Sequence, residues 1–408
     1  MLLHFLSLLA GAGMALGATV EDSARTLKIR NDNPLIYYHG RWDSSPGTWW
    51  AGSGFNINVQ NLKFLQLELG PHTTQPFLAL GVIFDDGPTN TVNVSQGVNE
   101  IAIPLPAEGK RDGLGEGKRT VVKFDVEGWQ NNRMNLESVI LNGDATLHPY
   151  EPSNLAFQFI GDSLSSGQFL PEGINQEWPF LVAERYKAEY RINAQPGAAL
   201  TVRFIFPSLY LLISNTQGVL GHRVVWQPTR SVIPILQGNR IMLFFIPPAI
   251  DEALVLQTED TGYFNTDDHN FTTPWDFSRD TNPPTTHVVI HIGANDASQN
   301  VTADEFVKVY EDFLVRLREI NPHQPIFVFT PWGWPNPDGT SSFYYDGQYQ
   351  KIVDARHAIG DTNVFLVNTT GWVSFDDVFP ENVHPNVPGN RKIADEFIAW
   401  LKEWGLEP

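Results

Sequence analysis

The first part of the chain alternates apolar and polar residues over short runs. Between residues 31 and 147, runs such as 55–59, 78–84 and 119–126 follow a period of two, and Gly, Pro, Asn and Asp separate them. No apolar stripe of helical spacing lies between these runs. Period-two runs at short, regular intervals are typical of antiparallel sheets. We therefore predict that residues 18–150 form an all-β sandwich of the jelly-roll type.

Beyond residue 153 the apolar runs become continuous, as in strands that a parallel sheet buries on both faces. Four such runs occupy residues 155–160, 287–292, 325–330 and 364–367. Amphipathic segments lie between them, and the clearest follows Thr302-Ala-Asp-Glu305, which has the form of a capping box. A last helix is predicted from about Gly389. Alternating strands and helices predict an α/β three-layer domain over residues 151–408.

One stretch inside the second domain has an unusual composition. From Tyr190 to Ile250 there is no Asp or Glu, although the chain contains 46 of them. Its two apolar runs, 204–213 and 241–248, are too short or too interrupted for a membrane span. We expect an atypical insertion at about residues 202–250, which is either a buried inserted segment or retained intron sequence. Sequencing the transcript would decide between the two.

Charge and cysteine content narrow the chemistry. The chain carries 46 acidic and 27 basic side chains, a net charge of −19, and no cysteine. An acidic chain without a Lys/Arg stripe repels phosphates, so no nucleic-acid partner is expected. The absence of cysteine removes thiolate nucleophiles, disulfides and cysteine zinc sites. His287 and His291 share one strand face, but no carboxylate at ligand spacing accompanies them, so no metal site is predicted.

The N-terminal segment predicts export. Residues 1–17 form a short apolar stretch that ends in Ala15-Leu16-Gly17, and we predict a signal peptide cleaved after Gly17. A buried N-terminal helix is the alternative. Sequons at Asn93, Asn270, Asn300 and Asn368 fit a glycosylated protein. We expect a secreted, extracellular protein that does not insert into a membrane.

A serine follows the first strand of the second domain. Ser163 lies in Gly161-Asp162-Ser163-Leu164, where a parallel sheet exposes a nucleophile at its carboxyl edge. The G-x-S-x-G pattern is absent, because Ser165 stands at the second glycine position. Taken alone, this tetrapeptide is a weak signal, and the default interpretation of Ser163 is a helix cap.

Three further segments point to the same edge. Gly197 follows the next predicted strand, Asn295 follows the strand at 287–292, and His384 lies in the loop before the last helix. Strand ends of an open α/β sheet converge on one crevice. Acyl transfer needs a base beside a weak hydroxyl and fixed donors for the oxyanion, and these segments supply both.

These four segments resemble those of the SGNH (GDSL-type) hydrolase superfamily. The resemblance implies a flavodoxin-like parallel sheet, Ser163 as nucleophile and His384 as general base. It also implies an oxyanion hole made by the Ser163 N–H, the Gly197 N–H and the Asn295 amide. No cofactor is implied.

The third member of the triad departs from the family pattern. The family places an Asp three residues before the His, and Glu381 stands there in this chain. In one interpretation, Glu381 orients the imidazole from a shifted backbone. In a second, Asp376 or Asp377 takes the role of the triad acid. The third interpretation is a Ser–His dyad whose imidazole is oriented by a backbone carbonyl.

The N-terminal half narrows the resemblance. Tyr38-His39-Gly40-Arg41-Trp42 and Gly52-Ser53-Gly54-Phe55 are similar to the β-domain of carbohydrate esterase family two. This similarity implies an acetyl esterase acting on O-acetylated plant polysaccharides or oligosaccharides, in a family noted for lacking the triad acid. The alternatives are a lipid or other short-chain ester hydrolase, and a carbohydrate-binding protein whose esterase domain has decayed.

Aromatic residues provide candidates for sugar contacts. Trp332 and Trp334 follow the strand at 325–330, and tryptophan rings stack on the apolar faces of sugars. Packing against the sheet edge is the alternative for each. Arg41 and Trp42 either face the crevice or are buried in the sandwich.

Overall fold

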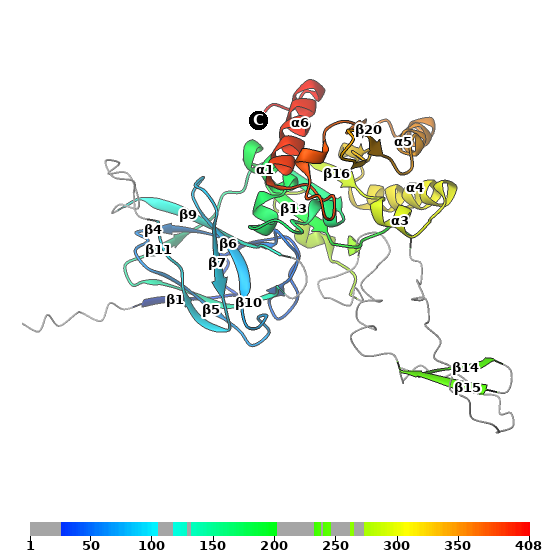
Figure 1. Cartoon of the computed structure of the whole chain (residues 1–408). Helices are drawn as coiled ribbons and strands as arrows, with labels where there is room; N and C mark the ends of the chain where they lie inside the picture. The colour runs from blue at the N-terminus through cyan, green and yellow to red at the C-terminus, as the bar shows by residue number, and fades with distance from the viewer. Residues whose placement is uncertain are drawn as a thin grey trace, which may run out of the picture.

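The computed structural model describes residues 26–104, 117–128, 132–201, 262–264 and 273–408, together with the backbone of 232–237 and 240–245. The described residues form an all-β region and an α/β region that pack side by side (Figure 1). The predicted signal peptide and most of the insertion at 202–250 lie outside the described residues. Within that insertion, β14 (Val232–Gln237) and β15 (Arg240–Phe245) pair antiparallel.

The N-terminal region contains two antiparallel sheets, which confirms the predicted sandwich. One sheet has the order β1-β10-β5-β8 with β3 beside β10, and the other has the order β11-β4-β9-β6-β7 with β2 beside β4. The strands of the first are β1 (Thr26–Arg30), β3 (Gly47–Thr48), β5 (Leu65–Leu69), β8 (Gly97–Glu100) and β10 (Met134–Asn142). Those of the second are β2 (Tyr37–His39), β4 (Gly54–Gln60), β6 (Leu78–Phe84), β7 (Asn90–Val94), β9 (Arg119–Val126) and β11 (Thr146–His148).

The period of two explains how the sandwich closes. In β5, Leu65, Leu67 and Leu69 are buried, whereas the two residues between them are partly exposed. Phe55 of β4 stacks on Phe124 of β9, with ring centroids 4.6 Å apart. The apolar faces of both sheets thus share one core.

The C-terminal region is built on a five-stranded parallel sheet of order β13-β12-β16-β17-β20. In chain order this arrangement is 2-1-3-4-5, as in flavodoxin-like folds. The strands are β12 (Ala156–Gly161), β13 (Glu189–Ala194), β16 (His287–His291), β17 (Ile326–Phe329) and β20 (Val364–Val367). Strand order reverses between β12 and β16, so the crevice expected for ligands lies at their carboxyl ends.

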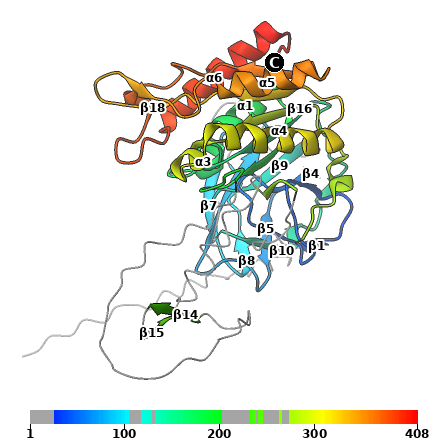
Figure 2. The ribbon, with the colours of Figure 1, turned by 90° about the vertical axis from the view of Figure 1, so that its right-hand side faces the viewer.

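Helices cover both faces of this sheet and complete the predicted three layers (Figure 2). Phe157 and Phe159 pack with α1 (Trp178–Tyr186) and α6 (Val387–Trp404). Val288 and Ile290 pack with α4 (Ala303–Ile320) and α5 (Gln348–Ala358) on the other face. The Thr302 side chain accepts a hydrogen bond from the Glu305 N–H, which fixes the start of α4 where the sequence predicts it.

Short elements connect these layers. They are 3₁₀ turns at Ser163–Ser165 (η1), Gly173–Gln176 (η2), Phe277–Asp280 (η4) and Phe375–Asp377 (η5), helix α3 (Ala294–Ser298), and strands β18 (Trp334–Pro335) and β19 (Ser341–Ser342). In the part of the chain that the structure describes, no helix is long and apolar enough to cross a membrane.

Candidate active site

Ser163 begins a short 3₁₀ turn directly after β12. Asp162 caps this turn, because its Oδ1 accepts a hydrogen bond of 2.9 Å from the Leu164 N–H. Asp162 is fully buried, and burial raises the pKa of its carboxyl to about 7. Its role is to fix the turn that presents the half-buried Ser163 at the sheet edge.

His384 lies against this serine. Its Nε2 is 2.9 Å from the Ser163 Oγ, and its Nδ1 is 3.1 Å from the Asn382 carbonyl oxygen. A carbonyl oxygen only accepts, so Nδ1 carries the proton and Nε2 is free to accept the serine proton. The loop itself is held by the Phe379 N–H, which donates to the His384 carbonyl oxygen at 2.9 Å.

No acidic side chain of the described residues contacts this imidazole, so the prediction of Glu381 as third triad member is wrong. Glu381 is exposed, and the Asn382 carbonyl occupies the position at Nδ1 that its carboxylate would need. Asp377 instead accepts hydrogen bonds from Ser374 and pairs with Lys392 at 2.7 Å. Of the three interpretations, only the dyad oriented by a backbone carbonyl has the required geometry.

The Asn295 amide and the turn after β13 lie together. Asn295, in α3 directly after β16, donates from Nδ2 to the Ala198 carbonyl oxygen at 2.8 Å. Gly197 has a φ of +83°, a conformation that strongly favours glycine. Because an amide nitrogen has two hydrogens, Asn295 can hold this turn and still donate to an oxyanion.

Asp296 reinforces the same connection. Its buried carboxylate accepts hydrogen bonds from the Leu200 N–H at 3.1 Å and the Thr201 N–H at 2.9 Å. Burial raises the pKa of this carboxyl, although the backbone hydrogen bonds oppose the shift. Asn295 and Asp296 therefore attach the segment after β13 to the end of β16. These two strands flank β12, the strand that leads to Ser163.

The surroundings of His384 favour its neutral form. Burial lowers the pKa of the imidazole, and the hydrogen bond with Asn382 offsets part of that shift. A neutral imidazole is the form that can take the Ser163 proton. Ser163 and His384 thus form a nucleophile–base pair suited to acyl transfer. Asn295 and the turn of Gly197 follow β16 and β13, the two neighbours of β12 in the sheet.

The two predicted tryptophans behave differently. The ring of Trp334 is half-buried and lies 6.4 Å from the His384 ring. Trp332 is only 1% exposed and stacks on His291 with ring centroids 4.0 Å apart. Of the two interpretations of Trp332, the structure therefore agrees with packing against the sheet and not with a subsite, because its ring turns inward.

Phe169 is a neighbour of the site that the sequence does not reveal. Its ring meets that of His384 edge-on at 4.9 Å, and it remains 52% exposed. Its φ is +69°, which is rare for a bulky residue and is maintained only where the surroundings fix it. No periodic pattern surrounds Phe169, so only the fold shows its position.

Arg41 and Trp42 are both buried, so neither faces the crevice. The Arg41 guanidinium pairs with Asp280 at 2.8 Å and lies 4.1 Å from the Trp275 ring centroid. Trp42 belongs to the sandwich core, where its indole N–H donates to the His39 and Gly54 carbonyls. Within the described ranges, no group of three or more His, Cys, Asp or Glu could hold a metal ion.

A comparison with protein families connects this geometry to known enzymes. Residues 257–392 match the model of the GDSL-like Lipase/Acylhydrolase family. The chain carries a GDSL-type hydrolase domain and is an ester-hydrolysing enzyme. The matched stretch contains Asn295 and His384, whereas Ser163 and Gly197 precede it. No curated protein sequence matches the chain.

Solved structures share the two-domain fold of this chain. A family two carbohydrate esterase from Clostridium thermocellum in complex with cellohexaose is 18% identical, with a TM-score of 0.62 over 90% of this chain and 98% of that chain. A family two carbohydrate esterase from Cellvibrio japonicus is 14% identical (TM-score 0.61; 93% and 98% covered). An acetyl xylan esterase from the rumen bacterium Butyrivibrio proteoclasticus is 13% identical (TM-score 0.59; 93% and 99% covered).

Proposed function

We propose that this enzyme is a secreted serine esterase that removes O-acetyl groups from plant polysaccharides or oligosaccharides. The observation that carries the proposal is the His384 imidazole, whose Nε2 lies 2.9 Å from the Ser163 Oγ and whose Nδ1 donates to the Asn382 carbonyl oxygen. Support for the substrate class comes from the similar solved structures, which are described as carbohydrate esterases and an acetyl xylan esterase.

The geometry suggests the order of steps. The Ser163 Oγ attacks the acetyl carbonyl carbon while His384 Nε2 takes its proton, and the oxyanion is held by the N–H groups of Ser163 and Gly197 and the Asn295 amide. His384 then gives the proton to the departing sugar oxygen. Water attacks the acetyl-enzyme with His384 again as base, which releases acetate and restores Ser163. The cycle requires no cofactor.

Export is part of the same proposal. Residues 1–17 have the pattern of a signal peptide, and the sequon residues Asn93, Asn300 and Asn368 are all exposed. Expression of the full chain in a eukaryotic secretory host tests this part. We expect processed, glycosidase-sensitive enzyme in the medium, and retention of the unprocessed chain inside the cell would contradict it.

The function is tested by acetate release from acetylated xylan and from an aryl acetate, with Ser163→Ala beside the parent. We expect release by the parent from both substrates and a loss of at least about 10⁴-fold in the variant, because it removes the hydroxyl that is hydrogen-bonded to His384. A preference for long-chain esters would favour a lipid esterase. Binding of xylan without any turnover would favour a binding protein with a decayed site.

A further inference from the structure

A groove of about 430 Å³ lies between the two domains, next to the catalytic residues. One wall comes from the sandwich and includes Phe77, Thr91 and Glu127. The other wall comes from the loop after η1, which includes Phe169, and from Pro196, the residue before Gly197. Phe169 also contacts the His384 ring, so the groove lies beside the catalytic site.

Main-chain contacts between the domains hold the two walls together. The Ile174 N–H donates to the Glu127 carbonyl oxygen at 2.9 Å. The loop approaches so closely that a Cβ at Gly173 would lie 2.1 Å from that same oxygen. The groove is therefore a formed feature of the domain interface and needs no rearrangement to exist.

The groove is suited to a neutral ligand rich in hydroxyl groups. Among the residues that the structure describes, no Lys or Arg lines the groove, and Glu127 is the one acidic residue of its lining. Burial, with a contribution from nearby Asp125, raises the pKa of the Glu127 carboxyl to about 9. The carboxyl is thus uncharged at neutral pH, and it lies 3.2 Å from the exposed Thr91 hydroxyl.

Two exposed aromatic rings supply the apolar surface. Phe77 is 51% exposed and Phe169 is 52% exposed, and they stand on opposite walls. Carbohydrate-binding sites typically combine exposed aromatic rings, which pack against the apolar faces of sugars, with neutral polar groups. The positive φ of Phe169 indicates that its surroundings hold it there at a conformational cost.

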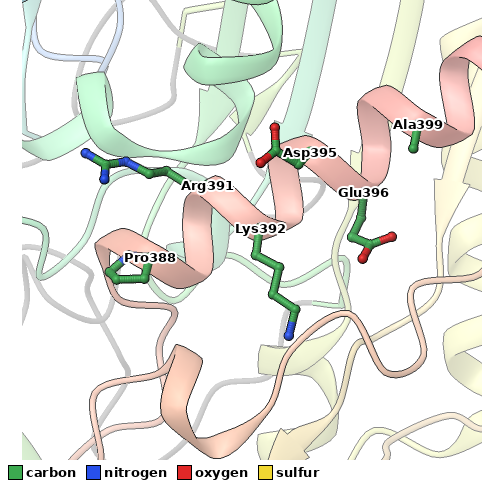
Figure 3. Close-up of a pocket in the computed structure, with 6 residues that line it drawn as sticks. All are labelled: Pro388, Arg391, Lys392, Asp395, Glu396 and Ala399. Carbon is green, nitrogen blue, oxygen red and sulfur yellow. The ribbon is translucent and has the colours of Figure 1, made fainter.

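A second hollow offers a contrast. It runs along the outer face of α6 and is lined by Pro388, Arg391, Lys392, Asp395, Glu396 and Ala399 (Figure 3). All six residues come from one helix, four of them are ionisable, and none is aromatic. This hollow lacks both the neutral character and the open rings of the interdomain groove.

We propose that the interdomain groove binds the neutral sugar residues that flank the acetylated residue, with Phe77 and Phe169 packing against sugar faces. This inference rests on the proposed function, since it concerns how the same active site receives an extended carbohydrate chain. It gives the β-sandwich a direct part in substrate recognition through the exposed residues Phe77 and Thr91.

The test is Phe77→Ala in the full chain, with Phe77→Tyr as the conservative variant. Val98→Ala is the matched control, because Val98 is 56% exposed in the same domain but outside the groove. We expect the ratio of kcat/KM on acetylated xylan to that on an aryl acetate to fall about three- to tenfold in Phe77→Ala. Phe77→Tyr and Val98→Ala should keep the parental ratio.

A binding measurement separates this inference from the proposed function. The Ser163→Ala variant, with and without Phe77→Ala, is titrated with xylohexaose and with cellohexaose. For each hexaose that binds, we expect Phe77→Ala to raise the Kd about three- to tenfold. The proposal that the groove binds sugars would be contradicted by any of three results: unchanged Kd values, no binding of either hexaose, or an equal loss of activity on both esters. If the parent cleaves aryl acetate but not acetylated xylan, the proposed function fails. The titration then still shows whether the groove binds sugars.

Discussion

The catalytic edge and the domain interface use polar groups in opposite ways. At the edge, the His384 ring accepts a hydrogen bond from the Ser163 hydroxyl at Nε2 and donates one from Nδ1 to the Asn382 carbonyl oxygen. At the interface, the Asp125 carboxylate is 0% exposed and accepts from Tyr190 and Asn175, with His39 Nε2 2.9 Å away. One arrangement leaves reactive groups accessible, and the other satisfies a buried charge.

This difference shows where each region resists change. Burial alone would raise the pKa of Asp125. The hydrogen bond and electrostatic interaction with His39, the Lys123 ammonium and the Tyr190 hydroxyl together outweigh burial and hold the pKa below its usual range. The partners of Asp125 come from both domains, so the cluster connects the sandwich to the hydrolase domain. Mutations at the interface should therefore cost stability, whereas mutations at the edge should cost rate.

The largest effect is expected for Asp125→Ala. This change leaves the Tyr190 hydroxyl and the Asn175 amide buried without their acceptor, so the free energy of unfolding should fall by about 3–5 kcal/mol. Urea denaturation measures the loss. Asp86→Ala is the control, since Asp86 is 81% exposed in its pair with Lys187 and should cost less than about 1 kcal/mol. Equal losses of unfolding free energy in the two variants would contradict the stabilising role of the buried Asp125 cluster.

The next effect tests the catalytic edge. Asn295→Ala removes a side-chain donor that lies beside the turn of Gly197 and Ala198, and kcat on an aryl acetate should fall about 10²- to 10³-fold. Urea denaturation of the same variant should show a much smaller loss of stability than Asp125→Ala. A kcat within threefold of the parent would exclude the Asn295 amide from the oxyanion hole.

The sequence predicts the positions of the catalytic segments because strong local patterns define them. Continuous apolar runs place β12 and β16 to within a residue or two, and parallel strands bring their carboxyl ends to one edge. Ser163 and Asn295 are therefore expected at the same edge without any knowledge of tertiary contacts. In the sandwich, β2, β3 and β11 have only two or three residues, which is too short for a period of two to be recognised.

The errors concern atoms and directions that the sequence does not encode. The group that orients His384 is the carbonyl of Asn382, and every residue has a carbonyl, so no side-chain pattern reveals it. Trp332 stacks on His291 because the loop after β17 directs its ring inward. The path of that loop depends on the tertiary structure. Glu127 becomes a groove residue only through the packing of the two domains.

A smaller effect concerns pH. His384 must be neutral to accept the Ser163 proton, so kcat/KM should rise with pH up to the imidazole pKa and then level off. Because burial lowers that pKa from its ordinary 6.5, the midpoint of the acid limb should lie below pH 6.5. Aryl acetate kinetics over the acid range measure it. A midpoint above 6.5, or a rate independent of pH, would conflict with a buried histidine base.

The smallest effect is expected for Glu381→Gln, which separates the dyad from a triad. The Glu381 side chain is exposed, and the Asn382 carbonyl already accepts the Nδ1 proton, so kcat should change less than about twofold. Steady-state kinetics on an aryl acetate, beside the parent, provide the measurement. A tenfold or larger loss would mean that the carboxylate reaches the imidazole during turnover. An unchanged rate would leave a backbone atom, which no side-chain substitution removes, as the orienting group.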